Sequence, residues 1–74
     1  MSHLSSLRPG QFATIKAIDA EDTLSQRLAA LGFRIGKKIE LIRRASFNGP
    51  MHVRIGTTDV ILRNSEAALI HISQ

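Results

Sequence analysis

The sequence predicts a mainly β fold: a small barrel of five short strands, with one inserted α-helix at about residues 22–31 and a short helical turn near 64–67. Apolar and polar residues alternate along several short segments, as in residues 51–55, and this period of two is typical of half-buried strands. Residues that favour turns separate these segments. With 74 residues, the chain is expected to form a single domain, 1–74.

The helix is predicted from Leu24, Leu28 and Leu31, whose spacing places them on one helical stripe. Gly32 follows where a helix commonly ends with a left-handed residue, so the helix is expected to stop at about Leu31. Phe33 is then placed to contact Leu28, the apolar contact that accompanies a Schellman motif. The direction in which the chain leaves the helix should therefore be set by packing.

The five strands are expected at residues 12–18, 38–45, 51–55, 60–62 and 70–72. Asn48-Gly49, followed by Pro50, predicts a hairpin turn between the second and third strands, because both Asn and Gly tolerate positive φ. Gly36 is a second residue at which the backbone can readily adopt positive φ, and it precedes the second strand. Each of these glycines, with Gly32 and Pro50, is expected to have a structural role.

The charge is unevenly distributed along the chain, which has a formal net charge of +4 and a pI of about 10.8. Acidic residues precede the helix, where they favour the positive end of its dipole, and Asp22 is the predicted N-cap with Asp19 as the alternative. Six of the ten basic residues lie between positions 34 and 54, namely Arg34, Lys37, Lys38, Arg43, Arg44 and Arg54. This segment favours an acidic partner or an anionic surface, although a solvated face is the simpler interpretation.

Several classes of chemistry are not expected from this sequence. There is no cysteine, which excludes disulfides and thiolate or iron–sulfur ligation. There is no P-loop motif and no evident arrangement of nucleophile, base and orienting group, so an enzyme is not expected. No apolar run approaches the roughly 18–20 residues that span a bilayer, and no secretory signal is evident, so we expect a cytoplasmic protein.

Metal binding is also not expected from the spacing of the candidate ligands. His3, His52 and His71, with Met51, are the soft or borderline ligands in the chain. No two of them have the short spacing that places two ligands together on a helix or in a turn, and His3 is expected in a frayed terminus. The sequence therefore predicts surface histidines that could pick up stray zinc, with no cofactor and no functional metal site.

Four segments of the chain, in order, resemble the FeoA family of bacterial accessory proteins, which also occur as a domain fused to metal-dependent repressors of the DtxR type. The segments are Leu7-Arg8-Pro9-Gly10-Gln11, Arg27-Leu28-Ala29-Ala30-Leu31-Gly32-Phe33-Arg34-Ile35-Gly36, Gly49-Pro50-Met51-His52-Val53-Arg54 and Ile61-Leu62-Arg63-Asn64-Ser65-Glu66-Ala67. The resemblance implies an SH3-like barrel with the helix in the first long connection. It also implies a cytosolic, noncatalytic accessory of ferrous iron uptake that contacts the GTP-binding region of the membrane transporter FeoB.

The sequence adds a candidate partner-binding surface near the helix exit. Its predicted members are Leu31, Phe33, Arg34, Ile35, Lys37 and Lys38, with Phe47 in the hairpin loop as a further candidate. Apolar side chains beside arginine are favoured at interface centres, and an aromatic at a loop tip is hard to explain by folding alone. For Leu31 and Phe33, a role in the core and the helix cap is the simpler interpretation.

The alternative function is a basic nucleic-acid-binding or transcription-associated module. Small basic barrels often bind RNA or DNA, and the basic segment could follow a phosphate backbone. The chain has only three aromatic residues, Phe12, Phe33 and Phe47, and Phe47 alone is expected to be free to stack on a base. Nucleic-acid binding is therefore less favoured than protein binding.

Overall fold

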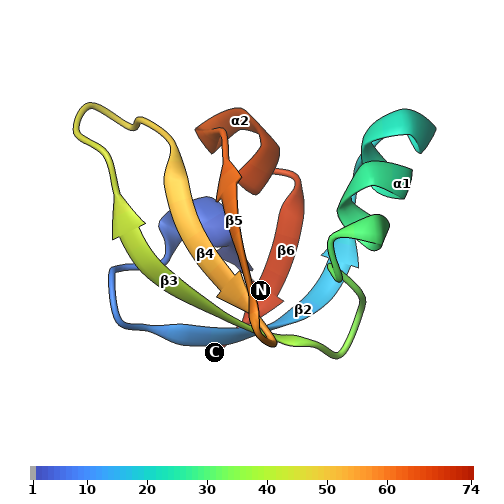
Figure 1. The fold of residues 1–74 in the computed structure, drawn as a ribbon, viewed down its shortest axis with the longest axis horizontal. Helices are drawn as coiled ribbons and strands as arrows, with labels where there is room; N and C mark the ends of the chain where they lie inside the picture. Colours follow the sequence, from blue (N-terminus) through green and yellow to red (C-terminus); the bar gives the residue numbers. More distant parts are fainter. Residues whose placement is uncertain (1) are drawn as a thin grey trace.

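The computed structural model describes residues 2–74, so only the first residue of the expected domain 1–74 lies outside it. A single curved antiparallel sheet forms most of the molecule, with helix α1 at one side and α2 above it (Figure 1). The elements in chain order are β1 Ser2–His3, the 3-10 helix η1 Leu4–Ser6, β2 Phe12–Ile18, α1 Asp22–Ala30, β3 Lys38–Arg44, β4 Met51–Ile55, β5 Thr58–Leu62, α2 Asn64–Ala67 and β6 Ile70–Ser73. The predicted mainly β fold with one inserted helix and a helical turn at 64–67 is confirmed.

The sheet has six strands in the order β1-β6-β2-β3-β4-β5, one more than the sequence predicted. The additional strand is β1, where Ser2 lies opposite Ile72 and His3 lies opposite His71 on β6. The expectation that His3 lies in a frayed terminus is therefore wrong. Within residues 2–74, β1 and β5 are not paired with each other, so the sheet curls without closing at these two edges.

The core lies on the concave side of this sheet and consists of apolar side chains from five strands and the helical segments. Its members are Leu4, Leu7, Ala13, Ile15, Leu28, Phe33, Ile39, Leu41, Met51, Val53, Ile55, Val60, Leu62, Ala67, Ile70 and Ile72. Alternate residues of each strand face this core, as the period-two pattern predicted. The apolar stripe of α1 also packs here, with Leu28 buried and Leu24 and Leu31 partly buried against the core.

The end of α1 is a Schellman motif, as predicted. Leu31 is the C-cap and Gly32 has a φ of 101°. The Phe33 N–H donates to the Leu28 carbonyl at 3.0 Å, and the Gly32 N–H donates to the Ala29 carbonyl at 3.0 Å. Both Leu28 and Phe33 are buried, so the turn leaves the helix directly over the core.

The start of α1 differs from the prediction. Glu21 is the N-cap and makes no side-chain cap hydrogen bond, whereas Asp22 already lies in the first turn and Asp19 precedes the helix. Neither predicted cap is correct. Asp22 still lies beside the free N–H groups of the first turn, where its charge favours the positive end of the helix dipole.

A β-bulge in β3 turns one of the basic residues inward. The pairing with β4 shifts between Leu41 and Arg43, so Arg43 lies opposite His52 while Arg44 lies opposite the buried Met51. The Arg44 guanidinium donates to the Ser5 carbonyl at 2.6 Å and to the Leu7 carbonyl at 2.8 Å. It also donates to Asn64 Oδ1 on α2 at 3.3 Å. Arg44 is thus a structural residue that joins η1, β3 and α2.

The hairpin between β3 and β4 turns one residue earlier than the sequence predicted. Phe47 and Asn48 are the two central residues with positive φ, 59° and 57°, and the Gly49 N–H donates to the Ser46 carbonyl at 3.1 Å. Gly49 itself has no positive φ. It is required for a different reason, because a Cβ there would lie 2.8 Å from Ala45 Cβ. Pro50 follows, and its carbonyl accepts the Ala45 N–H at 3.0 Å.

Within residues 2–74, no helix is both long enough and apolar enough to cross a membrane.

Arg44→Ala should lower the free energy of unfolding by about 2 kcal/mol, because its hydrogen bonds are charge-assisted and leave two carbonyls and an amide without a donor when lost. The matched control is Arg43→Ala on the exposed face of the same strand, which should change stability by less than about 0.5 kcal/mol. Urea denaturation of both variants measures the difference. Equal midpoints for the two variants would contradict the structural role of Arg44.

Phe47→Asn should raise the free energy of unfolding by about 0.5–1 kcal/mol, because Asn tolerates the left-handed backbone and the fully exposed Phe47 side chain loses no packing. Phe47→Val is the control with the opposite sign, since a β-branched residue is least tolerated at positive φ. Thermal melts of the two variants beside the native protein provide the comparison. If Asn destabilises the protein as much as Val does, the strain at position 47 has been misjudged.

Candidate functional site

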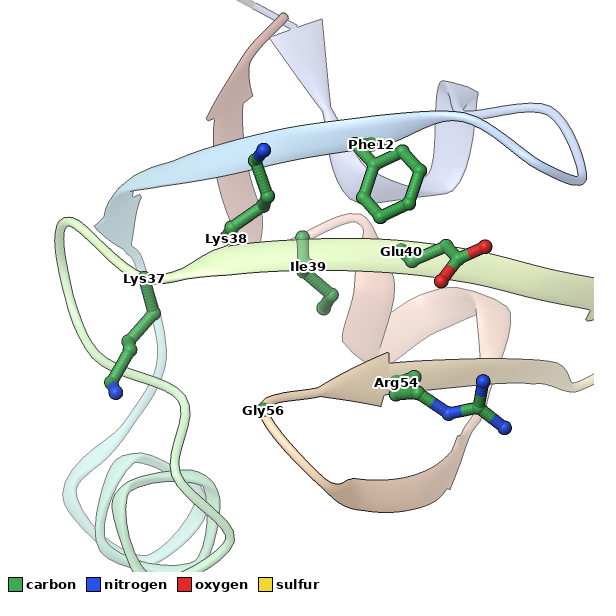
Figure 2. Close-up of a pocket in the computed structure, with 7 residues that line it drawn as sticks. All are labelled: Phe12, Lys37, Lys38, Ile39, Glu40, Arg54 and Gly56. Atoms are coloured by element: carbon green, nitrogen blue, oxygen red, sulfur yellow. The ribbon is translucent and has the colours of Figure 1, made fainter.

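A groove of about 310 Å³, here called the outer groove, lies beside the first residues of β3. It is lined by Phe12, Lys37, Lys38, Ile39, Glu40, Arg54 and Gly56. These residues come from β2, the loop before β3, the start of β3, the end of β4 and the β4–β5 turn (Figure 2). Ile39 is buried and the other side chains are exposed or half-exposed, so the groove combines a small apolar area with charged walls.

The strand register places four side chains of this face in one row across four strands. Phe12 lies opposite Glu40, Glu40 opposite Arg54, and Arg54 opposite Asp59. Successive members of such a row are cross-strand neighbours, close enough for their side chains to interact. The row therefore runs from an aromatic ring to an ion pair, with one carboxylate on each side of Arg54.

Arg54 is held by Asp59 through two hydrogen bonds, from Nε to Oδ1 at 2.7 Å and from Nη2 to Oδ2 at 3.2 Å. The hydrogen bond from Arg54 lowers the pKa of Asp59 to about 2, and the same bond raises the pKa of Arg54. Asp59 is thus ionised throughout the neutral range. Arg54 was counted in the sequence among the basic residues available to a partner. In the structure, its positive charge is paired with the negative charge of Asp59 in the same row.

Phe12 is the aromatic residue of the groove, and its exposure was not foreseen. Its side chain is 51% exposed, and Lys38 Nζ lies 5.4 Å from the centroid of its ring (Figure 2). This distance is within the range of a cation–π interaction. The expectation that Phe47 alone is free to stack on a ligand is therefore wrong. The signal in the sequence was that Phe12 breaks the alternation of its strand.

Residues 34–38, which we call the basic loop, join the helix exit to β3 and end in the groove. Arg34, Ile35, Lys37 and Lys38 are all exposed, Ile35 by 71%. The loop backbone is fixed against β2, since the Gly36 N–H donates to the Ile15 carbonyl at 2.8 Å and the Ile15 N–H donates to the Lys37 carbonyl at 2.9 Å. Gly36 has the positive φ that the sequence predicted, 91°. The loop therefore presents three cations and one isoleucine from a rigid backbone.

The other predicted partner-binding residues lie elsewhere. Phe33 is 1% exposed and Leu31 is partly buried against the core, so Phe33 cannot contact a partner in this conformation. Phe47 is fully exposed at the tip of the β3–β4 hairpin, and Figure 1 shows this hairpin on the opposite side from the basic loop. The seven residues of β3 separate the two by roughly 20 Å. Ile35 and Phe47 thus do not form one continuous patch.

One further exposed apolar residue was not predicted from the sequence. Ile61 on β5 is 65% exposed and lies opposite His52, which in turn lies opposite Arg43. It borders a second depression of about 400 Å³, lined also by Arg27, Pro50, Leu62, Arg63 and Glu66. Arg27 on α1 forms an ion pair with Glu66 on α2 in this depression. Ile61 stands between two buried residues of its strand, so the alternation alone could have marked it as exposed.

The described part of the chain holds no group of three or more His, Asp or Glu residues that could bind a metal ion. His52 Nε2 lies 3.2 Å from Asp59 Oδ2, but it is buried and forms no hydrogen bond within residues 2–74.

The arrangement of the outer groove and the basic loop, with an aromatic ring, an isoleucine and free cations, is suited to contact with another molecule.

Comparison with known proteins agrees with the family resemblance of the four sequence segments. The family model described as the FeoA domain matches residues 2–74. A candidate Fe(2+) transport protein A of Campylobacter jejuni is 34% identical over 70 residues, which cover 95% of each chain. A fusion protein of Porphyromonas gingivalis, named Fe(2+) transport protein A/Fe(2+) transporter FeoB, is 32% identical over 69 residues, or 93% of this chain and 8% of the fusion.

Solved structures agree with the fold. Iron(II) transport protein A of Clostridium thermocellum superposes with a TM-score of 0.89 at 36% identity, covering 95% of this chain and 43% of that one. FeoA of Stenotrophomonas maltophilia, solved in complex with zinc and described as an SH3 domain protein, has a TM-score of 0.86 at 27% identity and covers 99% of this chain and 91% of that one. The expected SH3-like fold is confirmed, and the chain belongs to the FeoA family.

Proposed function

We propose that this protein is a noncatalytic accessory of ferrous iron uptake that binds the membrane transporter FeoB on its cytoplasmic side. The observation that carries the proposal is the Porphyromonas gingivalis fusion, in which a segment 32% identical to this chain is joined to FeoB in one polypeptide. A covalent linker keeps two modules at a high effective concentration, which is useful where the modules act together. The GTP-binding region of the transporter is the specific contact we propose.

The basic loop is the proposed centre of the contact. Ile35 offers an exposed apolar side chain, and Arg34, Lys37 and Lys38 surround it with charges that have no ion-pair partner within residues 2–74. Apolar anchors become buried at the centre of an interface, while cations at its rim steer an acidic partner toward it. The fixed loop backbone reduces the entropy lost on binding. Phe12, beside Lys38, extends this surface into the outer groove.

Phe47 is proposed as a second contact at the other end of β3. The backbone at this position is strained and the ring is fully exposed, so the fold gains nothing from an aromatic side chain there. A partner that contacts both Ile35 and Phe47 must extend over roughly 20 Å, which is within the span of a protein–protein interface of ordinary size.

Nucleic-acid binding is less well supported by the arrangement of charges. Phe12 and Lys38 could stack on a base and contact a phosphate. However, Glu40 and Asp59 lie on either side of Arg54 in the same row, and carboxylates on the outer face repel a phosphate backbone. A protein partner with both acidic and basic groups can match this mixed surface, whereas a uniformly anionic polymer cannot.

The test uses Ile35→Ser and Phe47→Ser, singly and together, with the transporter in nanodiscs and with its isolated GTP-binding domain, each with GDP and with a nonhydrolysable GTP analogue. Each single change should weaken binding about fivefold to tenfold, and the double change more than tenfold, because apolar contact is lost while all charges remain. Biolayer interferometry measures the affinities. Binding to intact transporter but not to the isolated domain would move the contact to another part of FeoB.

Ile61→Ser is the matched control, since it removes an isoleucine of similar exposure that belongs neither to the basic loop nor to the tip of the β3–β4 hairpin. It should change the affinity less than twofold. The same three variants should bind a mixed-sequence oligonucleotide as the native protein does. Retention of full transporter binding and ferrous iron uptake by the folded double variant would refute the proposed surface, and no binding by the native protein would refute the proposed function.

A further inference from the structure

Two histidines from opposite ends of the sequence lie side by side on the outer surface of β1 and β6. His3 and His71 are directly opposite each other in the register of these antiparallel strands. Their ring centroids are 4.6 Å apart and the ring planes are tilted by 47°. We propose that this pair, here called the imidazole clip, is a binding site for one divalent transition metal ion of the zinc type.

The separation of the rings matches what a shared metal ion requires. Bonds of about 2.0–2.1 Å from metal to nitrogen place each ring centroid about 3.2 Å from the metal, so tetrahedral ligation separates two centroids by about 5 Å. The observed 4.6 Å is close to this value, so the separation of the two rings is compatible with one nitrogen of each ring binding the same ion. The strand pairing has already fixed the backbone, so little conformational entropy remains to be lost.

The site is open to solvent on its outer side. His3 is exposed and His71 is half-exposed, while Ile70 and Ile72 on either side of His71 are buried, so both imidazoles point away from the core. Two protein ligands leave room for water molecules to complete a tetrahedral shell. Binding therefore needs no rearrangement of the fold.

The ligand chemistry determines which ions the clip accepts. Two neutral imidazoles without a carboxylate favour borderline ions such as zinc, nickel and copper, and they disfavour magnesium and calcium, which prefer oxygen. Affinity for such a site rises along the series from iron(II) to copper(II), so the clip is not selective for ferrous iron. The proposal is therefore independent of the proposed role in iron uptake.

Metal binding would have a structural consequence at the edge of the sheet. β1 consists of two residues, and its edge opposite β6 has no pairing with β5. An ion held by His3 and His71 would cross-link β1 to β6 and stabilise the pairing of the two strands. The amide protons of Ser2, His3 and Leu4 should then exchange more slowly with solvent when the metal is bound.

Zinc chloride alone is the probe for the test, because zinc is redox-inactive and readily accepts tetrahedral imidazole ligation. Isothermal titration calorimetry should give one zinc per protein chain. In NMR spectra, the imidazole signals of His3 and His71 should shift together, and hydrogen exchange should slow in β1. Removal of zinc with EDTA should reverse both effects.

His3→Ala and His71→Ala should each weaken zinc binding about tenfold or more, because one imidazole alone is a poor ligand set. His52→Ala is the matched control and should change the affinity less than twofold, since His52 lies on β4 with its Nε2 buried. Native-like affinity in either clip variant would overturn the proposal. So would binding that requires two chains per zinc in sedimentation experiments, because the ion would then bridge molecules instead of strands.

Discussion

The Schellman turn at the end of α1 is the constraint from which the geometry of the candidate surface follows. Gly32 supplies the positive φ, and the adjacent Phe33 is buried over the core, so the chain can leave the helix in one direction only. The next residues are tied to β2 by hydrogen bonds with Ile15 before β3 begins at Lys38. Because Phe33 before the basic loop is buried and the loop backbone is held against β2, the side chain of Ile35 is left exposed to solvent.

The positive charge of the chain is less available to a partner than its composition suggests. Arg44 is directed inward by the bulge in β3 and is used by three groups of the protein itself. Arg54 is paired with Asp59, and Arg27 is paired with Glu66. Three exposed cations without an ion pair, Arg34, Lys37 and Lys38, lie together in the basic loop, whereas Arg8, Lys16, Arg43 and Arg63 are exposed elsewhere. The basic loop is thus a local cluster of positive charge beside a mixed face, which favours recognition of a specific protein over nonspecific binding to a polyanion.

The sequence could predict those elements that depend on local signals. The helix exit, the strands at 12–18 and 51–55, and the turn at 64–67 each follow from residue spacing within about ten positions. It could not predict β1 or the inward turn of Arg44, because both depend on pairing with residues far along the chain. It also placed Phe47 at the hairpin but not at positive φ, since glycine at position 49 is the more usual left-handed residue. Of the candidate site, the basic loop was foreseen, whereas Phe12 was not expected to be free to contact a ligand.

The N-terminal segment connects the two features that the sequence did not reveal. Leu4 and Leu7 are buried in the core, so residues 4–7 cover its open end. This cover is held on one side by Arg44, through the carbonyls of Ser5 and Leu7, and on the other by the pairing of β1 with β6. A metal ion on the imidazole clip would strengthen the second attachment. Only β2 lies between β6 and the basic loop in the order of strands, so such an ion would stabilise the sheet beside the strand that holds the loop.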